Sequence, residues 1–530
     1  MIRLTQFCGT RPASRGMAAR RRLMIAVAGA WLWAAVAVAG EKNSGYMAAL
    51  ESITPGQLQQ HVVVLAGDAM EGREAGSHGG YAAGEYLAAQ LTKLGFRGAG
   101  ADGGFFQPFP PNLRNVLAIE EGRDPELNHQ MIVLGAHYDH VGWGNQRNSR
   151  GPIGQIHHGA DDNASGVAAL LELAKAFTLL PERPKRSLLF VGFDGEEKGL
   201  LGSKYWVAHP TVRLDGVVAM VNMDMIGRLR GDRAMVYGAR SGYGLRRLVS
   251  FQNEDAKLLL EFPCGVLPKA DYYPFYAQGV PVLMLHTGLH DEYHRPSDTA
   301  DRINSQGMQC VARLLFALVY GLADGDDVPR FRPGADKESA ESQARLLQAT
   351  PLGDRLGATW STGRAPGGGV YVTRVPIGSP AQRGGLQQGD RIVRLDGCDI
   401  QTADDLTGAV ATAPTPATAI VQRPGQAEPL SLTVPLEGKP LRLGITWHVD
   451  DAEPGTVVLT QVVPGSPAAA AGVRVGDRVY QVAGREFSDD AQFAMMVTTL
   501  PGPLALLVER DGRVQAVIIH FHSEPMKRAA

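Results

Sequence analysis

The sequence predicts an α/β domain whose central sheet is mixed, largely parallel and flanked by helices, followed by two small α+β domains. Short apolar runs alternate with helical patterns up to about residue 325, which predicts the first part. An internal repeat beyond residue 350 predicts the second part. The chain has 530 residues, enough for two to four domains of roughly 100 to 200 residues each.

Four apolar runs have the length and composition of buried strands. They cover residues 131–136, 188–193, 217–221 and 281–285. Apolar residues at helical spacing predict helices over 80–94 and 164–180. Strands that alternate with helices favour a parallel sheet, and sites in such sheets form outside the carboxyl ends of the strands. We therefore expect functional residues in the segments that follow these runs.

The N-terminus has the three parts of an export signal. Basic residues 20–22 precede an apolar run at 23–36, and the small residues 37–39 fit a cleavage site. The apolar run is shorter than the roughly 20 residues that a membrane-spanning helix needs. We expect residues 1–39 to be a signal peptide and the protein to be periplasmic or secreted, with membrane attachment only if this segment stays uncleaved.

Composition narrows the possible partners and metal ligands. The formal net charge is -2, and basic residues are not clustered outside the N-terminus, which argues against a nucleic-acid partner. The cysteines beyond the signal, Cys264, Cys310 and Cys398, are too widely spaced for a zinc knuckle or a disulfide framework, although one disulfide is possible. A metal site in this chain must therefore use His, Asp and Glu.

The domain boundaries follow from a polar segment and from the repeat. We expect a catalytic domain at 40–325, a linker at 326–350 and two modules at 351–437 and 438–523. The modules share motifs at a constant offset of 87 residues (443 − 356). These are LGAT at 356–359 and LGIT at 443–446, GSPA at 378–381 and 465–468, and GDR at 389–391 and 476–478. A constant offset across three motifs indicates a tandem duplication.

Five segments of the first domain bring histidine or carboxylate side chains close to predicted strand ends or to loops. They contain His137 and Asp139, Asp161 and Asp162, Glu196 and Glu197, Asp224, and His290 and His294. Taken singly, each is more often a structural residue or a cap. Taken together, they converge where a parallel sheet gathers its strand ends, and so many like charges need compensation. Divalent cations supply that compensation.

The residue types then indicate the metal and its number. Imidazole and carboxylate ligands without thiolate favour Zn²⁺, with Mn²⁺ or Co²⁺ as weaker alternatives. Two histidines and three carboxylates are too many for one tetrahedral ion that keeps a position open for water. With one shared carboxylate they hold two ions, so we expect two Zn²⁺ per chain.

The adjacent residues Glu196 and Glu197 suggest two different catalytic roles. Only one of two neighbouring residues can point directly at the cluster, so we expect Glu197 to be a ligand and Glu196 to be the general base. Asp139, two residues after His137, is expected to accept the second imidazole N–H of that histidine.

These segments, together with DAMEGREAGSHGGYAAGEYLAAQL from residue 68, closely resemble the zinc aminopeptidase family M-28 and follow its order up to YHRPSDT. The resemblance implies the same two-zinc arrangement. By this resemblance, His137 and Asp224 would bind one zinc ion, and Glu197 and His294 would bind the other. Asp162 would bridge the two ions. It also implies a cis peptide after Asp162 and a catalytic base at Glu196.

Two departures from the family leave points open. Relatives often read Ser-Asp-His where this chain has Ala270-Asp271-Tyr272, so the group that stabilises the oxyanion is undecided, with Tyr272 or Tyr273 as candidates. Five further histidines match no ligand position and are expected to be structural or to line the pocket. They are His140, His157, His158, His286 and His290.

The two repeats resemble PDZ domains. Leu356-Gly357 and Leu443-Gly444 match the loop whose backbone N–H groups bind a peptide C-terminal carboxylate. The resemblance implies peptide or protein C-termini as partners, bound along a sheet edge. The alternative is that these domains only pack on the catalytic domain or bind nothing, because a fold by itself does not establish binding.

The sequence thus predicts an exported metallo-aminopeptidase that acts on peptides, with a PDZ pair that binds or delivers them. One alternative is a glutaminyl cyclase, an acyltransferase with one zinc on the same fold. The other is a PDZ adaptor with an inactive peptidase scaffold. The residue preference, the choice between aminopeptidase, dipeptidase and carboxypeptidase action, and the oligomeric state stay open.

Overall fold

The computed structural model describes residues 44–363 and 365–521, so the signal peptide predicted at 1–39 lies outside the described residues. The chain divides into two compact units, 1–47 and 48–530. All contacts discussed below lie within the second unit.

A nine-stranded mixed sheet forms the first domain, in the order β1-β3-β5-β4-β6-β9-β7-β8 with β2 paired to β3. The central strands β5, β4, β6 and β9 are parallel, whereas β3 and β7 pair antiparallel to their neighbours β5 and β9. This confirms the mixed, largely parallel sheet. The strands are β1 (Arg97–Gly98), β2 (Phe106–Phe109), β3 (Leu113–Glu120), β4 (Met131–His137), β5 (Ser187–Phe193), β6 (Val217–Met223), β7 (Arg233–Tyr237), β8 (Leu259–Glu261) and β9 (Val282–His286).

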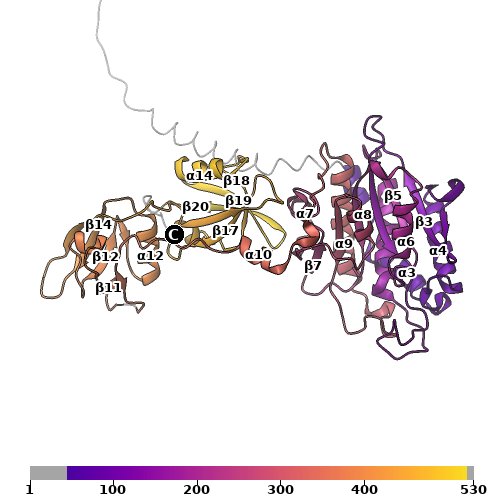
Figure 1. Ribbon diagram of the computed structural model, residues 1–530, viewed down its shortest axis with the longest axis horizontal. Coiled ribbons are helices and arrows are strands. Elements are labelled where there is room, and N and C mark those ends of the chain that lie inside the picture. Colours follow the sequence, from indigo (N-terminus) through magenta and orange to yellow (C-terminus); the bar gives the residue numbers. More distant parts are fainter. Residues whose placement is uncertain (1–43, 364, 522–530) are drawn as a thin grey trace, which may run out of the picture. The chain divides into compact units, whose positions relative to one another are not determined.

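Helices flank the sheet (Figure 1). Helices α5 and α9 contact β4 and each other, while α8 contacts β6, β9 and α6. The helices are α2 (Ser44–Glu51), α3 (Pro55–Leu65), α4 (His78–Lys93), α5 (Gly166–Thr178), α6 (Leu201–Ala208), α7 (Leu245–Gln252), α8 (Tyr272–Ala277) and α9 (Ser305–Asp324). The two helices and four strands expected from apolar spacing correspond to α4, α5, β4, β5, β6 and β9.

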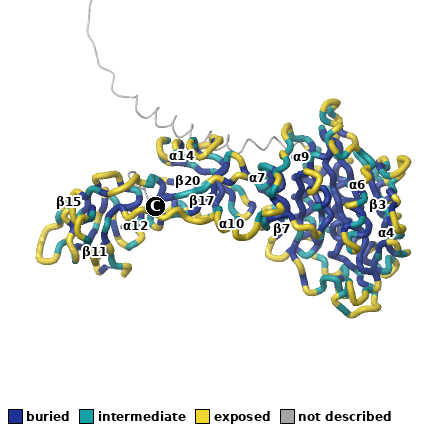
Figure 2. The backbone as a smooth tube through the Cα atoms, in the orientation of Figure 1, coloured by how far each residue is buried: buried dark blue, intermediate teal, exposed yellow. Residues whose placement is uncertain are grey.

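Strands β4 and β5 are buried along their whole length, and β6 and β9 at all but one residue each (Figure 2). Met131 and Val133 of β4 pack in one cluster with Trp206 of α6 and Phe275 of α8. Strands covered on both faces are apolar at successive positions rather than at alternate ones. This is why continuous apolar runs located these strands in the sequence.

Strand register brings the ends of three strands to one edge of the sheet. His137, the last residue of β4, is paired with Phe193, the last residue of β5. Gly135 of β4 is paired with Asn222 of β6, so Asp224, which follows β6, starts its loop level with His137. The segments after β4, β5 and β6 therefore leave the sheet side by side.

Helix α9 is long and apolar enough to cross a bilayer by length and composition alone, and no other helix in the described ranges meets that test. However, 67% of its most apolar window is buried inside the protein, where the helix packs against α3, α5 and β4. Core helices of soluble proteins have the same character, so α9 is weak evidence for a membrane span.

The segment expected as a linker at 326–350 contains a helix, α10 (Ala340–Leu346). Ser339 begins this helix with a capping box in which Ser342 takes part. Gln343 accepts a hydrogen bond from the thiol of Cys264 at 2.9 Å. The three cysteines of the described ranges are free, so the possible disulfide is not formed.

Two small α+β domains follow, as predicted. Each has a five-stranded antiparallel path, β10-β11-β12-β14-β15 with β13 beside β12, and β16-β17-β18-β19-β20. The first contains β10 (Thr359–Trp360), β11 (Val370–Arg374), α11 (Pro380–Arg383), β12 (Arg391–Leu395), β13 (Cys398–Asp399), α12 (Ala403–Thr412), β14 (Ala417–Gln422) and β15 (Leu430–Val434). The second contains β16 (Ile445–Val449), β17 (Val457–Val462), α13 (Pro467–Ala470), β18 (Arg478–Val482), α14 (Asp490–Thr499), β19 (Leu504–Arg510) and β20 (Arg513–Ile519).

The second small domain caps a helix of the first domain. Helix α7 begins after Gly244, which has no side chain to cap it. Glu453, in the loop between β16 and β17, accepts hydrogen bonds from the backbone N–H groups of Arg246 and Arg247 at 3.0 and 3.2 Å. Unpaired N–H groups at a helix start attract a carboxylate. The two domains thus share one capped helix.

Buried ion pairs reinforce this contact. Arg246 donates two hydrogen bonds of 3.0 Å to Glu509 of β19, whose side chain is fully buried. Asp450 accepts from Arg240 of the first domain and from Arg478 of β18. Arg247 pairs with Glu486 close by, but the side chain of Glu486 is 63% exposed. Buried and exposed pairs therefore lie in the same interface.

These pairs should differ in energy. Replacing Glu509 with Gln leaves the buried Arg246 uncompensated, and we expect a destabilisation of about 3–5 kcal/mol. Glu486→Gln, the matched control, should destabilise by less than about 1 kcal/mol, because the pair is exposed. Thermal unfolding of the full chain measures both, and equal shifts in melting temperature would contradict the assignment.

Glu453 makes the contact sensitive to pH. Burial, together with the charge of Asp450, raises the pKa of Glu453 to about 7. A carboxyl whose pKa is higher in the folded protein stabilises it fully below the unfolded pKa, and this contribution is lost as the pH rises through 7. We expect the melting temperature of Glu453→Gln, relative to the wild type, to rise between about pH 5.5 and about pH 8. A difference that stays constant over this range would exclude the effect.

Candidate metal centre

Seven buried or half-buried side chains converge beyond the ends of β4, β5 and β6. Six of them supply donor atoms that form two groups, and within each group the atoms lie within 4.8 Å of one another. One group is His140, Asp162, Glu197 and His294, and the other is His137, Asp162 and Asp224. The five residues predicted as metal ligands are all in these groups, and Asp162 is in both. The seventh side chain is Glu196.

Two carboxylates face the ring of His294, whose neutral form has a single N–H. Its Nδ1 lies 2.9 Å from the carbonyl oxygen of Asn148 and donates to it, which leaves a lone pair on Nε2. That Nε2 is 3.0 Å from Oδ2 of Asp162 and 3.1 Å from Oε1 of Glu197, yet it has no hydrogen-bond partner. Burial lowers the pKa of His294, but these two carboxylates raise it to about 10. The site therefore attracts positive charge.

His137 repeats this arrangement on the other side of Asp162. Its Nδ1 is 3.2 Å from the carbonyl oxygen of Asp139, so Nε2 again points a lone pair inward. Nε2 lies 3.4 Å from Oδ1 of Asp162 and 3.7 Å from Oδ1 of Asp224. Imidazole nitrogen and carboxylate oxygen in this ratio are donors suited to Zn²⁺. The donors therefore fit two cations that share Asp162.

Glu196 belongs to neither donor group, although it adjoins Glu197. Burial raises its pKa well above the ordinary value, helped by the charges of Asp271, Glu197 and Asp224 and opposed by His137. The two adjacent glutamates thus occupy different positions.

Asp139 makes contacts that the sequence did not indicate. Its carboxylate accepts hydrogen bonds from the backbone N–H groups of Glu196 and Glu197 at 3.0 and 3.3 Å. The distance from this carboxylate to Nδ1 of His137 is 3.7 Å, longer than the 3.2 Å to the carbonyl oxygen of Asp139. Asp139 therefore positions the two glutamates more directly than it holds the histidine.

His140 was expected to be structural or to line the pocket, and it lies inside a donor group. Its Nδ1 is 3.1 Å from Oε1 of Glu197 and 3.7 Å from Oδ2 of Asp162. Burial lowers its pKa well below the ordinary value, so its ring is neutral and can donate to Glu197 or bind a cation. The other four histidines of that set, His157, His158, His286 and His290, lie outside both groups.

Three buried side chains tie the loops of the site together. Arg73 donates to the carbonyl oxygens of Tyr138, His158 and Gly159. Asn163 bonds to both sides of Asp224, donating to the carbonyl of Met223 at 2.9 Å and accepting from the N–H of Met225 at 3.1 Å. Asp298 accepts from the N–H groups of Asp161 and Asp162 at 2.9 and 3.2 Å. The Asp162–Asn163 peptide is cis, as the resemblance implies.

The two tyrosines proposed as oxyanion donors, Tyr272 and Tyr273, make contacts with the protein core. Tyr272 is 1% exposed, and its hydroxyl accepts a hydrogen bond from the N–H of Leu267 at 3.0 Å. Tyr273 packs partly buried against the core. Tyr293, which the sequence did not suggest, stacks on His294 with ring centroids 3.9 Å apart. Burial and the nearby charges of Asp162 and Glu197 raise the pKa of Tyr293, so its hydroxyl keeps its proton.

The two predicted peptide-binding loops already use one N–H group each. The N–H of Gly357 donates to Oδ1 of Asp354, and that of Gly444 donates to the carbonyl of Leu441, both at 2.7 Å. Leu356 and Leu443, which precede these glycines, are buried in their domain cores. A ligand carboxylate at either loop would therefore compete with an internal acceptor.

Family comparisons agree with this geometry. Residues 115–319 match the family described as Peptidase family M28. This region of the chain is an M28 peptidase domain. Residues 346–418 and 458–510 match families described as PDZ domain. The predicted family and the two following PDZ domains are thus confirmed.

Curated relatives match part of the chain. A probable zinc metalloprotease of Pyrenophora teres f. teres is 37% identical over 127 residues, covering 23% of this chain and 25% of that protein. Aminopeptidase YwaD of Bacillus subtilis is 25% identical over 228 residues, covering 41% of this chain and 46% of that protein. The chain thus spans about a quarter to a half of the length of these relatives.

Solved structures are similar to part of the chain. The LapA aminopeptidase of Legionella pneumophila has a TM-score of 0.45 at 19% identity, covering 53% of this chain and 75% of that one. BSAP, a zinc aminopeptidase from Bacillus subtilis, has a TM-score of 0.34 at 22% identity, covering 41% and 52%.

The M28 site allows a test of how its loops are held. Asn163→Ala removes the bonds that fix Asp162 beside Asp224, and we expect zinc affinity to fall roughly tenfold or more, as when residues behind metal ligands are lost. Competition with a chelator of known affinity measures this. Asn112→Ala, at an exposed position, is the control, and equal affinities for the two variants would contradict the role of Asn163.

Proposed function

We propose that the chain is a zinc-dependent aminopeptidase that uses two Zn²⁺ ions per chain. One observation carries the proposal: two groups of donor atoms share Asp162. Glu196, the sequence neighbour of the donor Glu197, belongs to neither group. One ion would be held by His137, Asp162 and Asp224. The other would be held by Asp162, Glu197 and His294, with His140 beside them.

Bound zinc would polarise the scissile carbonyl and lower the pKa of water at the site. Glu196 then takes a proton from the attacking water and passes it to the leaving amine, as a general base followed by a general acid. Asp139 fixes the backbone of Glu196 through the hydrogen bond of 3.0 Å. Tyr293, whose ring stacks on His294, keeps its hydroxyl proton and would be a further hydrogen-bond donor.

Peptide hydrolysis at an N-terminus is supported by the relatives. YwaD of Bacillus subtilis is named an aminopeptidase, and a relative from Arthroderma otae is named leucine aminopeptidase 1. The second donor group favours hydrolysis over a one-zinc glutaminyl cyclase, and the complete set of donors with Glu196 argues against an inactive scaffold. We extend the proposal to export, on the composition of residues 1–39, and to peptide binding by the PDZ pair.

Two substitutions distinguish the proposed general base, Glu196, from the proposed shared metal ligand, Asp162. Glu196→Gln should retain two zinc ions per chain, while turnover of an aminoacyl reporter amide falls by roughly 10² to 10⁴. Asp162→Asn should lose both zinc and turnover, because it takes the shared carboxylate from both groups. Metal analysis and initial rates on the same preparations measure this.

Near-normal hydrolysis by Glu196→Gln would refute the mechanism. One zinc per wild-type chain, together with cyclisation of an N-terminal glutamine, would favour the cyclase alternative. An N-acetylated reporter is the control for exopeptidase action, because an aminopeptidase should leave it intact.

A further inference from the structure

The loop between β4 and the Asp162 segment is fastened to His294. The carbonyl oxygen of Asn148 accepts a hydrogen bond from Nδ1 of His294 at 2.9 Å. Two residues later, the backbone N–H of Arg150 donates to the carbonyl oxygen of His294 at 3.0 Å. The backbone of residues 148–150 is therefore held at both of its ends by a proposed zinc ligand.

The side chain of Arg150 lies over the ring of Tyr293. Its guanidinium carbon is 4.7 Å from the centre of that ring, and the same ring stacks on His294 with centroids 3.9 Å apart. An aromatic ring attracts a guanidinium within about 6 Å of its centre. Tyr293 is close to the acidic groups of the site, because burial and the charges of Asp162 and Glu197 raise its pKa. The cation of Arg150 thus lies one aromatic ring away from the metal centre.

Arg150 is not neutralised by an acidic neighbour. Two other arginines of this region, Arg228 and Arg302, both pair with Glu292, at 2.9 and 3.0 Å. Arg150 is exposed, and in the part of the chain that the structure describes no carboxylate forms an ion pair with it. Its charge is therefore available to an anion that approaches the metal centre.

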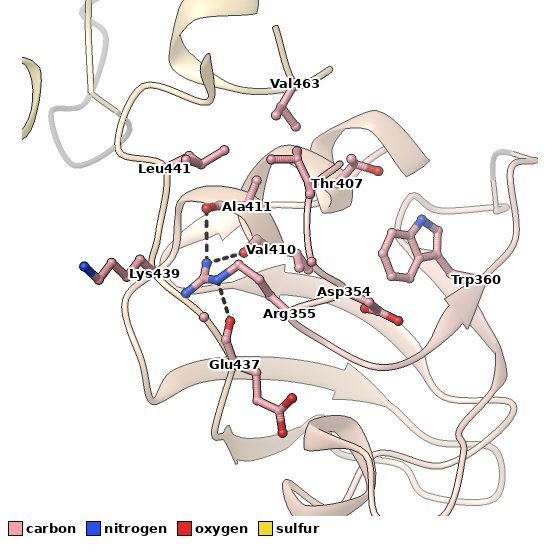
Figure 3. A pocket seen from close by; sticks show the side chains of 13 residues that line it. Asp354, Arg355, Trp360, Thr407, Val410, Ala411, Glu437, Lys439, Leu441 and Val463 are labelled. Carbon is pink, nitrogen blue, oxygen red and sulfur yellow. Dashed lines mark hydrogen bonds between the residues drawn. The ribbon is translucent and has the colours of Figure 1, made fainter. Parts of the chain in front are cut away.

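The hydrogen-bond donors of Arg150 are also unused. A contrast is Arg355, a buried arginine of the first PDZ domain, which donates to backbone carbonyl oxygens (Figure 3). Its acceptors are the carbonyls of Val410, Ala411 and Glu437. No described residue accepts a hydrogen bond from the guanidinium of Arg150, so its five N–H donors can bind the oxygens of a ligand.

The position of this cation favours a carboxylate on the leaving side of the scissile bond. The N-terminal residue of a substrate carries an ammonium group, which the like charge of Arg150 repels. In a dipeptide the leaving residue carries the C-terminal carboxylate, one residue or at most about 3.6 Å of chain beyond the scissile carbonyl. Arginine binds carboxylates through two parallel N–H···O bonds. A longer peptide has an uncharged amide at the same point.

We propose that Arg150 is a specificity-determining residue that binds the C-terminal carboxylate of a dipeptide, so that the enzyme prefers dipeptides with a free carboxylate. This rests on the aminopeptidase function proposed above and names its substrate class. Arg150 takes no part in the chemical step. It holds the leaving residue while the metal centre and Glu196 act on the peptide bond.

The test compares leucyl-glycine with leucyl-glycinamide, which differ at the C-terminal group alone. Release of free leucine by the zinc-loaded full chain gives kcat/KM for each, and the acid-to-amide ratio is compared between proteins. Arg150→Gln should lower this ratio at least about tenfold, because a charge-assisted pair is lost. Arg150→Lys keeps the charge and should retain more of the ratio, whereas Arg150→Glu should lower it further than Gln. Arg147→Gln, at another exposed arginine of the loop, is the control and should keep the wild-type ratio.

A binding measurement makes the test independent of turnover. Calorimetry should show that leucyl-glycine binds at least about tenfold more weakly to Glu196→Gln when Arg150→Gln is added, and leucyl-glycinamide should show no such loss. Equal acid-to-amide ratios in the wild type and Arg150→Gln, or an equal loss in Arg147→Gln, would overturn the proposal. In either case continued release of leucine would leave the peptidase function standing. Absence of leucine release from the wild type would refute that function, and the calorimetric comparison would still decide the role of Arg150.

Discussion

The peptidase domain depends on a concentration of buried lone pairs that only added positive charge, a proton or a cation, can hold together. Nε2 of His294 lies within 3.1 Å of Asp162 and Glu197, while its Nδ1 is held as a donor by a backbone carbonyl. Such an arrangement is repulsive unless positive charge lies among these atoms. The rest of the site can be understood as the means of keeping these donors together while cations compensate them.

Buried side chains that bond to loop backbones keep these donor atoms together. Arg73, Asp139, Asn163 and Asp298 are each 1% exposed or less, and each bonds to segments that leave different elements. Because their partners are backbone groups, they fix the course of a loop rather than one rotamer. Removing any of them leaves buried polar groups unsatisfied. The donors converge because their loops are held on all sides.

Buried polar side chains also hold the C-terminal half to the peptidase domain. Glu453 of the second PDZ domain caps α7 of the peptidase domain, and Glu509 neutralises Arg246 of that helix. Glu453, Glu509 and Asp450 each have a partner from the peptidase domain, which makes the contact specific. Arg355, buried at the PDZ junction, bonds instead to backbone carbonyl oxygens of its own domain.

The sequence by itself determined the sheet and the family of the site. β4, β5, β6 and β9 are covered on both faces, so their apolar runs are continuous and visible without a structure. Glu196 and Glu197 could be assigned different roles because adjacent side chains point in different directions. The order of the motifs identified the M28 family, and the offset of 87 residues identified the duplication.

Only the tertiary structure decided which polar groups meet. Asp298 bonds to Asp161 across 137 residues, and Asn163 bonds to Met223 across 60; neither pairing leaves a local pattern. For the same reason His140 was assigned outside the donor group, although it is three residues from His137. The acceptor for Gly357, the cap from Glu453 and the position of Arg150 over Tyr293 depend on how loops and domains pack. Periodicity records burial along a strand or helix, whereas hydrogen-bond partners are fixed by distances in space.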